Sequence, residues 1–216
     1  MSSGSREQVL GKVRRATGSG APNIAESYAA LERKYVRAGR MGLEERLALM
    51  VERLREYDAE VVEALPDSLS AEMAAMLRAS GRRTFVAAPG LPAAWLAPGY
   101  DWKIDNELTT AEIEQMDGVV TASFCGIADS GTIVLHHSPA EGRRVISLLP
   151  DWHLCVLRAS DVVETLPEYF ARCAAAPELA TYISGPSATA DIEMTRIKGV
   201  HGPRFLNVIL LRDEMK

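Results

Sequence analysis

Short apolar segments with the character of β-strands alternate with helical patterns along most of this chain, and this alternation limits the possible folds more than any other feature. Helical patterns at residues 68–81 and 160–174 separate several of the strands. Strands in such an alternation form a mostly parallel sheet with helices on both faces. We therefore expect an α/β fold. The expected strands are residues 60–65, 83–90, 118–124, 131–137, 153–158, 181–184 and 204–212.

Helical patterns also dominate the part of the chain before residue 60. The clearest helix begins at Leu43, because apolar residues follow at positions 47, 50, 51, 54 and 57 and form one stripe. Earlier helices are expected at residues 6–16 and 24–39, the second ending at Gly39. The stretch TGSGAPN between them is typical of a flexible linker.

Charge is distributed unevenly along the chain. Residues 1–40 contain eight Lys or Arg and three Asp or Glu, whereas residues 41–216 contain sixteen and twenty-six. An acidic body is a poor general binder of nucleic acid. The basic segment suits either docking on an acidic partner or a solvated helix face. We expect a basic helical arm with a linker at residues 1–40 and an α/β domain at residues 41–216.

Cysteine usage and hydropathy limit the compartment and the chemistry. Cys125, Cys155 and Cys173 form no C-x-x-C pair, as is common in a reducing compartment, and three cysteines cannot ligate a four-cysteine iron–sulfur cluster. The first residues contain no apolar signal core, and no apolar run approaches the roughly 20 residues of a membrane span. We expect a soluble cytoplasmic protein that does not enter a membrane.

Several common motifs of nucleotide-binding and hydrolytic proteins are missing from the sequence. It contains no G-x-G-x-x-G, no Walker loop and no G-x-S-x-G elbow. Their absence weakens assignment to the Rossmann dehydrogenases, the P-loop proteins and the α/β-hydrolases.

Polar residues crowd the turn that leads into the apolar strand TIVLHH. Asp129, Ser130, Gly131 and Thr132 form that turn, and Arg143 lies beyond the strand. Glycine lets backbone N–H groups approach a ligand, hydroxyls add donors, and a guanidinium group suits carboxylate or phosphate. These residue types indicate a pocket for a small anion. The same residues also suit a hydrogen-bonded turn with surface arginines, so both interpretations stay open.

A second polar segment, ISGPSATADIEMTRIKGVHGP, includes the end of the last short strand. Ser187 suits the start of a helix whose N–H groups face an anion, and His201 lies where it can transfer a proton. Loops at the carboxyl ends of parallel strands bind ligands in open α/β sheets, although these residues also suit ordinary turns. The candidate ligand-binding residues are Ser184, Gly185, Ser187 and Gly202, and the candidate catalytic residues are Asp191, Glu193 and His201.

The remaining histidines do not indicate a metal site. His136 and His137 are neighbours on a predicted strand, so they point to opposite faces and cannot chelate one metal together. His153 begins another strand and suits either a structural histidine or a hydrogen-bond donor at the pocket rim. Cys125 lies in an apolar segment, where a thiol stays protonated. We expect no metal.

Three segments, GIADSGTIVL, GRRVISLLPDWHLCVL and ISGPSATADIEMTRIKGVHGP, together resemble the motifs of the LUD-domain family, in particular its LutC/YkgG lactate-utilization type. They occur in the family's order, and the resemblance covers roughly residues 45–212. It implies a NagB/RpiA/CoA-transferase-like fold, which is a three-layer sandwich around a mainly parallel sheet. In this chain a helical N-terminal segment precedes that fold.

The resemblance also implies a function. The chain would be an accessory subunit of a cytoplasmic system that oxidises L-lactate to pyruvate together with two iron–sulfur proteins. Those partners would hold the clusters, so no cofactor is expected on this chain alone. Its pocket would bind a small anionic ligand such as lactate, phosphate or a CoA-like molecule.

Two other hypotheses fit the same residues. The chain could be an independent enzyme that binds a CoA thioester or a phosphorylated small molecule, with Glu193 as nucleophile or base. It could also be a non-catalytic scaffold or sensor, in which the polar segments serve only to fold the sheet edges.

Overall fold

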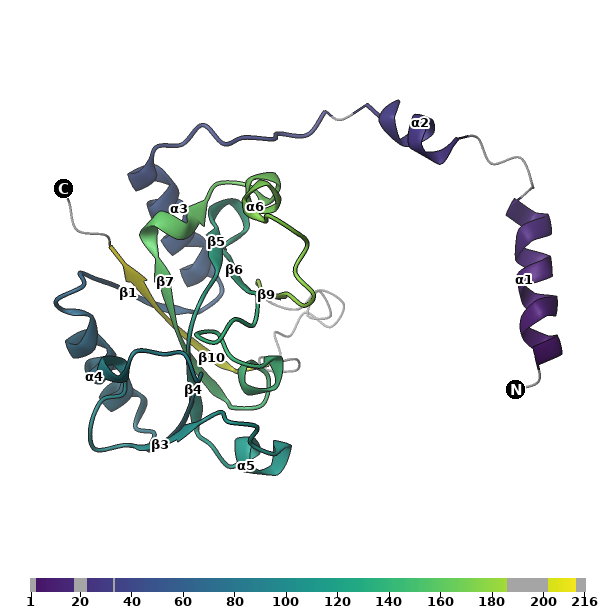
Figure 1. The fold of residues 1–216 in the computed structure, drawn as a ribbon. Helices are drawn as coiled ribbons and strands as arrows, with labels where there is room; N and C mark the ends of the chain where they lie inside the picture. Colours follow the sequence, from purple (N-terminus) through teal and green to yellow (C-terminus); the bar gives the residue numbers. More distant parts are fainter. Residues whose placement is uncertain (1–2, 18–22, 33, 186–201, 213–216) are drawn as a thin grey trace. The chain divides into compact units, whose positions relative to one another are not determined.

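The computed structural model divides the chain into two compact units. They are Met1–Tyr35 and Val36–Lys216, and the second is called the body below. The division expected after residue 40 into an arm and an α/β domain stays a prediction. The structure describes residues 3–17, 23–32, 34–185 and 202–212 (Figure 1).

The first unit contains two helices, α1 (Ser3–Thr17) and α2 (Ile24–Ala29). The side chain of Asn23 caps α2 by accepting a hydrogen bond of 3.2 Å from the backbone N–H of Ala25. The helix expected at residues 24–39 is shorter in the structure, because α2 ends at Ala29, ten residues before Gly39. Leu31 is 58% exposed, and short helices are only marginally stable in water without tertiary packing.

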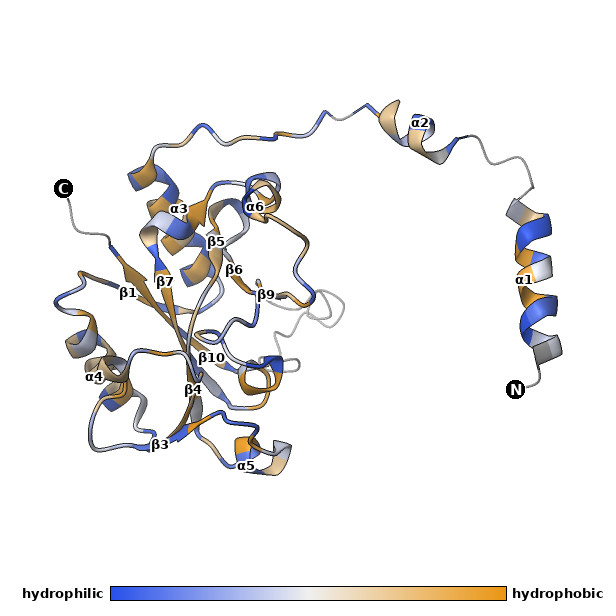
Figure 2. Ribbon diagram, in the orientation of Figure 1, coloured by the Kyte–Doolittle hydropathy of each residue, from blue (hydrophilic) through white to orange (hydrophobic). Residues whose placement is uncertain are grey.

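The body is built around a six-stranded sheet in which every neighbouring pair of strands is parallel. This arrangement confirms the expected α/β fold with a mainly parallel sheet, and Figure 2 shows that hydrophobic residues dominate these strands. In spatial order the strands are β1 (Glu60–Ala64), β10 (Phe205–Leu211), β7 (Trp152–Arg158), β4 (Gly118–Ala122), β2 (Thr84–Ala87) and β3 (Asp101–Ile104).

Two helices pack on opposite faces of this sheet. Successive side chains of a strand point to opposite faces. In β10, Val208 belongs to the apolar cluster that contains the buried residues of α3 (Leu43–Glu56), whereas Ile209 belongs to the cluster that contains those of α4 (Leu69–Ser80). The sheet is therefore the middle layer between helices, as in a three-layer sandwich (Figure 1).

The apolar stripe expected after Leu43 forms the buried face of α3. Its spacing of three and four residues places the stripe on one side of the helix. Glu44 and Glu45 in the first turn and basic residues in the last turn complement the helix dipole. The buried residues of α3 are Leu47, Met50, Val51 and Leu54.

A second, four-stranded sheet is a feature that the alternation of strands and helices did not predict. Its strands are β5 (Cys125–Ile127), β6 (Thr132–Leu135), β8 (Val162–Val163) and β9 (Thr181–Ile183). Strand β6 is antiparallel to both β5 and β9, whereas β5 and β8 are parallel. One face packs against α3, because Ile133 shares its cluster. The other face packs against α6 (Leu166–Arg172), because Val134 lies in the same apolar cluster as Tyr169 of that helix. In spatial order the strands are β8, β5, β6 and β9.

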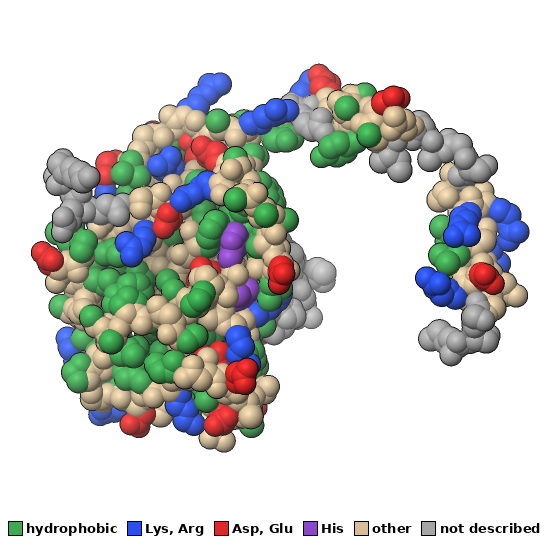
Figure 3. Space-filling model, in the orientation of Figure 1, with side chains coloured by type: hydrophobic (Ala, Val, Ile, Leu, Met, Phe, Trp, Pro, Cys, Tyr) green, Lys and Arg blue, Asp and Glu red, His purple; other side chains and the backbone are tan. Residues whose placement is uncertain are grey.

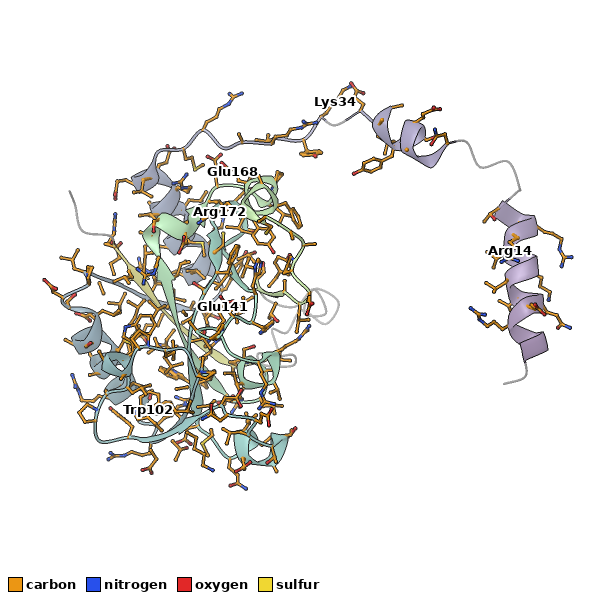
Figure 4. The ribbon with its side chains drawn as sticks, in the orientation of Figure 1. Arg14, Lys34, Trp102, Glu141, Glu168 and Arg172 are labelled. Atoms are coloured by element: carbon orange, nitrogen blue, oxygen red, sulfur yellow. The ribbon has the colours of Figure 1, made fainter. Side chains whose placement is uncertain are left out.

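The helix expected at residues 160–174 is shorter in the structure. Only α6 (Leu166–Arg172) is helical, because a capping box between Thr165 and Glu168 starts the helix at Leu166. Val162 and the next valine instead form β8, which suits β-branched side chains. Figure 4 labels Glu168 and Arg172 on α6. The other short elements are α5 (Thr110–Glu114) and the 3₁₀ turns η1 (Ala93–Trp95), η2 (Ala128–Ser130), η3 (Arg144–Ser147) and η4 (Ala159–Asp161).

Candidate functional site

A pocket of about 460 Å³ lies between α6 and the sheet face that this helix covers. Residues 182 and 184 of the β9 segment share this face because strand side chains alternate. Leu166 and Phe170 line it from α6, since residues four apart lie on the same side of a helix. We call this site the hydroxyl pocket; it is lined by Ile127, Asp129, Ser130, Thr132, Leu166, Phe170, Tyr182 and Ser184.

Three side-chain hydroxyls of the pocket form a continuous hydrogen-bonded chain. The oxygens of Ser130 and Thr132 are 2.7 Å apart, and the hydroxyl of Thr132 donates to that of Ser184 over 2.8 Å. The pairing of β6 with β9 brings these residues together, since Ile133 lies opposite Ile183. The two polar segments found in the sequence therefore contribute to one site.

The glycine in the first segment is required by packing. Gly131 has φ +62°, a conformation that L side chains rarely adopt, and a Cβ there would lie 2.5 Å from the Cβ of Arg53 on α3. Its N–H already donates to the carbonyl of Ala128 over 3.2 Å. Beside it, the hydroxyl of Tyr57 donates to the carbonyl of Ser130 over 3.0 Å. The structure thus shows a turn held against α3, whereas contact of the Gly131 backbone with a ligand stays a prediction.

The walls of the pocket combine apolar surface with one exposed carboxylate. Ile127, Leu166 and Phe170 supply the apolar part, and Asp129 supplies the carboxylate. No Lys or Arg is among the lining residues that the structure describes. Figure 3 shows hydrophobic side chains next to histidine side chains on one face of the body. In its described part, the pocket therefore offers hydroxyl groups and apolar contact to a ligand.

Arg143, the expected anion ligand, is bound to a carboxylate of the protein itself. Its Nε donates to Asp105 over 2.8 Å and its Nη2 donates to the same carboxylate over 2.5 Å. Nη2 also donates to the carbonyl of Leu108 over 2.8 Å. The side chain of Asp105 is 0% exposed, and its hydrogen bonds raise the pKa of Arg143. Arg143 does not line the hydroxyl pocket, so its role in binding an external anion stays a prediction.

His153 lies in the interior of the sheet, on β7 between β10 and β4. Its Nε2 is 2.8 Å from the hydroxyl oxygen of Thr121, and its Nδ1 has no hydrogen-bond partner among the described residues. Burial lowers the pKa of His153 to about 4, because removal of water disfavours the charged form. His153 is only 1% exposed, and its expected role as a hydrogen-bond donor at the pocket rim stays a prediction.

Four candidates of the second polar segment, Ser187, Asp191, Glu193 and His201, lie outside the described residues. Gly185 follows Ser184 directly and has φ +54°, a conformation that favours glycine. A Cβ at Gly185 would lie 3.4 Å from the ring of Tyr57, which is ordinary contact. Gly202 precedes β10, and a Cβ there would have no described atom within 4 Å. Their expected roles stay predictions.

The cysteines and histidines show no metal-binding arrangement in the described part of the chain. No group of three or more His, Cys, Asp or Glu side chains there could hold a metal ion. His136 and His137 contact different partners, Tyr169 and Thr181 respectively. Burial raises the pKa of Cys125 to about 11 and that of Cys155 to about 12. In addition, no helix of the described residues is long and apolar enough to span a membrane.

Sequence reasoning missed the aromatic residues of the pocket. Tyr182 precedes Ser184 by two positions on a strand, so period-two alternation could have placed both on one face. Leu166 and Phe170 carry a similar signal, because two apolar residues four positions apart lie on the same side of a helix. In the structure both are exposed. What the sequence could not show is that α6 covers this particular sheet face.

Comparison with known proteins identifies the family. The LUD domain family matches residues 7–211. Lactate utilization protein C of Deinococcus radiodurans is 40% identical over 164 residues, which are 74% of this chain and 76% of that protein. Lactate utilization protein C of Bacillus subtilis is 36% identical over 124 residues, 54% of this chain and 51% of that protein. The uncharacterized protein YkgG of Escherichia coli is 42% identical over 103 residues, 44% of each chain.

A solved structure agrees with the sequence matches. The crystal structure of a DUF162 family protein from Deinococcus radiodurans is similar with a TM-score of 0.64 and 31% identity, over 80% of this chain and 99% of that chain. The B. subtilis and E. coli matches span only about half of those proteins. The family match itself covers nearly all of the described residues. The chain therefore belongs to the LUD domain family.

Proposed function

We propose that this chain acts in lactate utilization, as an accessory subunit of a cytoplasmic iron–sulfur system that oxidises L-lactate to pyruvate. The observation that carries this proposal is the 40% identity to a Lactate utilization protein C over 74% of this chain and 76% of that protein. The structural similarity to a DUF162 family protein, with a TM-score of 0.64 and 31% identity, supports a shared fold as well.

The proposal assigns the iron–sulfur clusters to two partner proteins. The chain contains three cysteines, and a conventional cluster needs four thiolates. Cys125 and Cys155 are buried, with a raised pKa that keeps both thiols protonated, which opposes metal ligation. Removal of a hydride or electrons from lactate requires a cofactor, because protein side chains lack that chemistry. The partners would therefore supply the electron acceptor.

The hydroxyl pocket would hold the small anionic ligand of this system. Each hydroxyl has a single hydrogen, and Thr132 donates its own to Ser184, so the bond between Ser130 and Thr132 uses the hydrogen of Ser130. The hydrogen of Ser184 is then left to donate to a carboxylate oxygen, which is a strong acceptor. The apolar walls suit the methyl group of a three-carbon acid. Asp129 is exposed, so water and salt screen its repulsion of an anion.

Deletion of the gene for this chain tests the proposal in its host. We expect loss or strong slowing of growth on L-lactate as sole carbon source, with normal growth on glucose. A plasmid copy of the wild-type gene should restore growth, and so should a Ser70→Ala control, whose hydroxyl binds the carbonyl of Ala94 away from the pocket. A Thr132→Val copy should restore growth poorly. Undiminished growth of the deletion strain on L-lactate would contradict the proposal.

A further inference from the structure

A chain of hydrogen bonds leads from the hydroxyl pocket into the core of the body. Tyr182 lines the pocket, and its hydroxyl donates to the hydroxyl of Tyr169 over 3.1 Å. The hydroxyl oxygen of Tyr169 is 2.8 Å from Nε2 of His136. Tyr169 is fully buried, so its hydroxyl depends on these two partners for its hydrogen bonds.

The surroundings hold the imidazole of His136 in one place. The ring of Phe124 stacks on it, with centroids 3.7 Å apart and planes inclined by 16°. The backbone N–H of His136 donates to the carboxylate of Glu141, a residue only 5% exposed that Figure 4 labels within the body. The ring of Tyr169 meets the imidazole edge-on at 5.7 Å. Since packing fixes the ring, its protonation state controls the hydrogen-bond chain.

The direction of each hydrogen bond in this chain depends on one proton. Each phenol has a single hydrogen to donate. When Nε2 of His136 is unprotonated, it accepts from Tyr169, Tyr169 accepts from Tyr182, and the oxygen of Tyr182 has only lone pairs left for a further partner. When Nε2 carries a proton, it donates to Tyr169, Tyr169 donates to Tyr182, and the hydroxyl of Tyr182 has its hydrogen left for a further partner.

We propose that Tyr182 determines which ligand group the hydroxyl pocket recognises, and that Tyr169 and His136 set whether Tyr182 accepts or donates. This inference rests on the proposed function, because it takes a small 2-hydroxy acid as the ligand. With Nε2 of His136 unprotonated, the ligand hydroxyl donates to the oxygen of Tyr182. A 2-oxo acid lacks that hydrogen and is favoured only when protonated His136 turns Tyr182 into a donor.

The charged and titratable groups around His136 determine when the reversal occurs. Burial lowers the pKa of His136 below its ordinary value of 6.5, with a smaller lowering by His137 and an opposing increase from Glu141. Tyr169 on α6 and Tyr182 on β9 are the other groups that face it, and burial raises the pKa of Tyr169, so the phenol of Tyr169 stays protonated. When the proton of neutral His136 lies on Nδ1, the pocket is in its accepting state, and it changes to its donating state when the ring takes up a second proton at a pH below 6.5.

Nitrogen NMR of the full-length protein tests the chain of hydrogen bonds without any ligand. The protein contains four histidines, and a His136→Gln variant assigns the signals of His136. At pH 8 we expect the tautomer with the proton on Nδ1 and an unprotonated Nε2, and protonation of Nε2 as the pH falls below 6.5. A Tyr169→Phe variant, which keeps the buried ring, should shift the Nε2 resonance. A proton on Nε2 at pH 8 would overturn the proposal.

Titration calorimetry with L-lactate and pyruvate at pH 8 and pH 5 tests the effect on recognition. Wild-type protein should prefer L-lactate at pH 8 by roughly two- to tenfold, the effect of one net hydrogen bond, and should lose this preference at pH 5. Tyr182→Phe should show no preference at either pH, and Tyr169→Phe should show a preference that does not change with pH.

The control is Tyr100→Phe, because Tyr100 packs against Phe85 and Trp102 outside the pocket, and it should behave like wild type. A preference that is the same at both pH values in wild type would overturn the role of His136. Failure of both acids to bind would instead contradict the proposed function, and the tautomer of His136 would still decide the hydrogen-bond chain.

Discussion

Thr132 donates a hydrogen bond of 2.8 Å to Ser184, although the two residues are 52 positions apart in the chain. The bond crosses the antiparallel pair β6–β9, beside the pairing of Ile133 with Ile183. Thr132 also lies 2.7 Å from the hydroxyl of Ser130, so it is the middle of the chain of hydroxyls. It is therefore the residue through which the two polar segments of the sequence are connected.

Thr132→Val should weaken ligand binding while it keeps the fold. Thr132 is only 5% exposed, and valine retains its shape but removes a hydroxyl that is hydrogen-bonded on both sides. Without this hydroxyl, Ser184 loses the partner that orients its own hydrogen bond to the ligand; weakening by one hydrogen bond costs about 0.5–1.5 kcal/mol, or roughly two- to tenfold in affinity. Thermal-shift titration with L-lactate measures this change. Ser70→Ala is the control, and equal ligand shifts in Thr132→Val and wild type would place the ligand elsewhere.

Gly131→Ala should destabilise the body, and Gly81→Ala provides a matched control. Both glycines have positive φ, +62° and +67°, so alanine at either position incurs the conformational cost of about 1–2 kcal/mol. Only at Gly131 would the new Cβ also meet Arg53, 2.5 Å away, whereas Gly81 has open space. Urea denaturation should therefore show a clearly larger loss of unfolding free energy for Gly131→Ala. Equal losses in the two variants would contradict the packing of this turn against α3.

The fold could be predicted where the signal is local. The stripe of α3 needs only the spacing of Leu47, Met50 and Leu54, and the helix follows that spacing. The second sheet could not be predicted in this way. Val162 pairs with Gly126, far away in the sequence, and the pattern around Val162 fits a helix as well as a short strand. Long-range pairing therefore overrode the local pattern.

The candidate site shows the same division between local and long-range information. The residue types at Ser130, Thr132 and Ser184 could be selected from the sequence as hydrogen-bonding groups. Their contact depends on the β6–β9 register, which the sequence does not specify. Arg143 was an equally good candidate by type, but it pairs with Asp105, 38 positions away. The sequence carries no signal of that partner.

Arg143→Ala should lower the stability of the protein even without a ligand. It leaves the carboxylate of Asp105, whose side chain is 0% exposed, without its bidentate partner. An unpaired buried acceptor costs about 1–3 kcal/mol, and more if it stays charged. Urea denaturation of Arg143→Ala, Asp105→Asn and the double variant measures the coupling between the two residues. The double variant should lose less unfolding free energy than the sum of the two single losses, because the first substitution already breaks the pair. Unchanged stability in Arg143→Ala, with loss of ligand protection, would instead support direct anion binding by Arg143.

His153 should make the protein less stable as the pH falls from 6.5 towards 4. Burial lowers the pKa of His153 to about 4, whereas the unfolded chain keeps the ordinary value of 6.5, so the unfolded state binds the proton first. Well above pH 6.5 the imidazole is neutral in both states and costs no stability. By pH 5 the unfolding free energy should have fallen by about 2 kcal/mol. Urea denaturation at pH 8 and pH 5 measures the change. His153→Gln should lose less stability than wild type over this interval, and an equal loss would assign the effect to other groups.

The chain by itself should not oxidise lactate. Its three cysteines are too few for a conventional cluster, and the sequence has no dinucleotide-binding fingerprint. We expect a colourless protein that reduces no dye with L-lactate until the two iron–sulfur partner proteins are added. Omission of this chain from the complete mixture should then lower the rate, and Thr132→Val should reproduce part of the loss, while Ser70→Ala should not. A coloured preparation of the pure chain that oxidises L-lactate would show that it holds a redox cofactor, and the role of an accessory subunit would have to be abandoned.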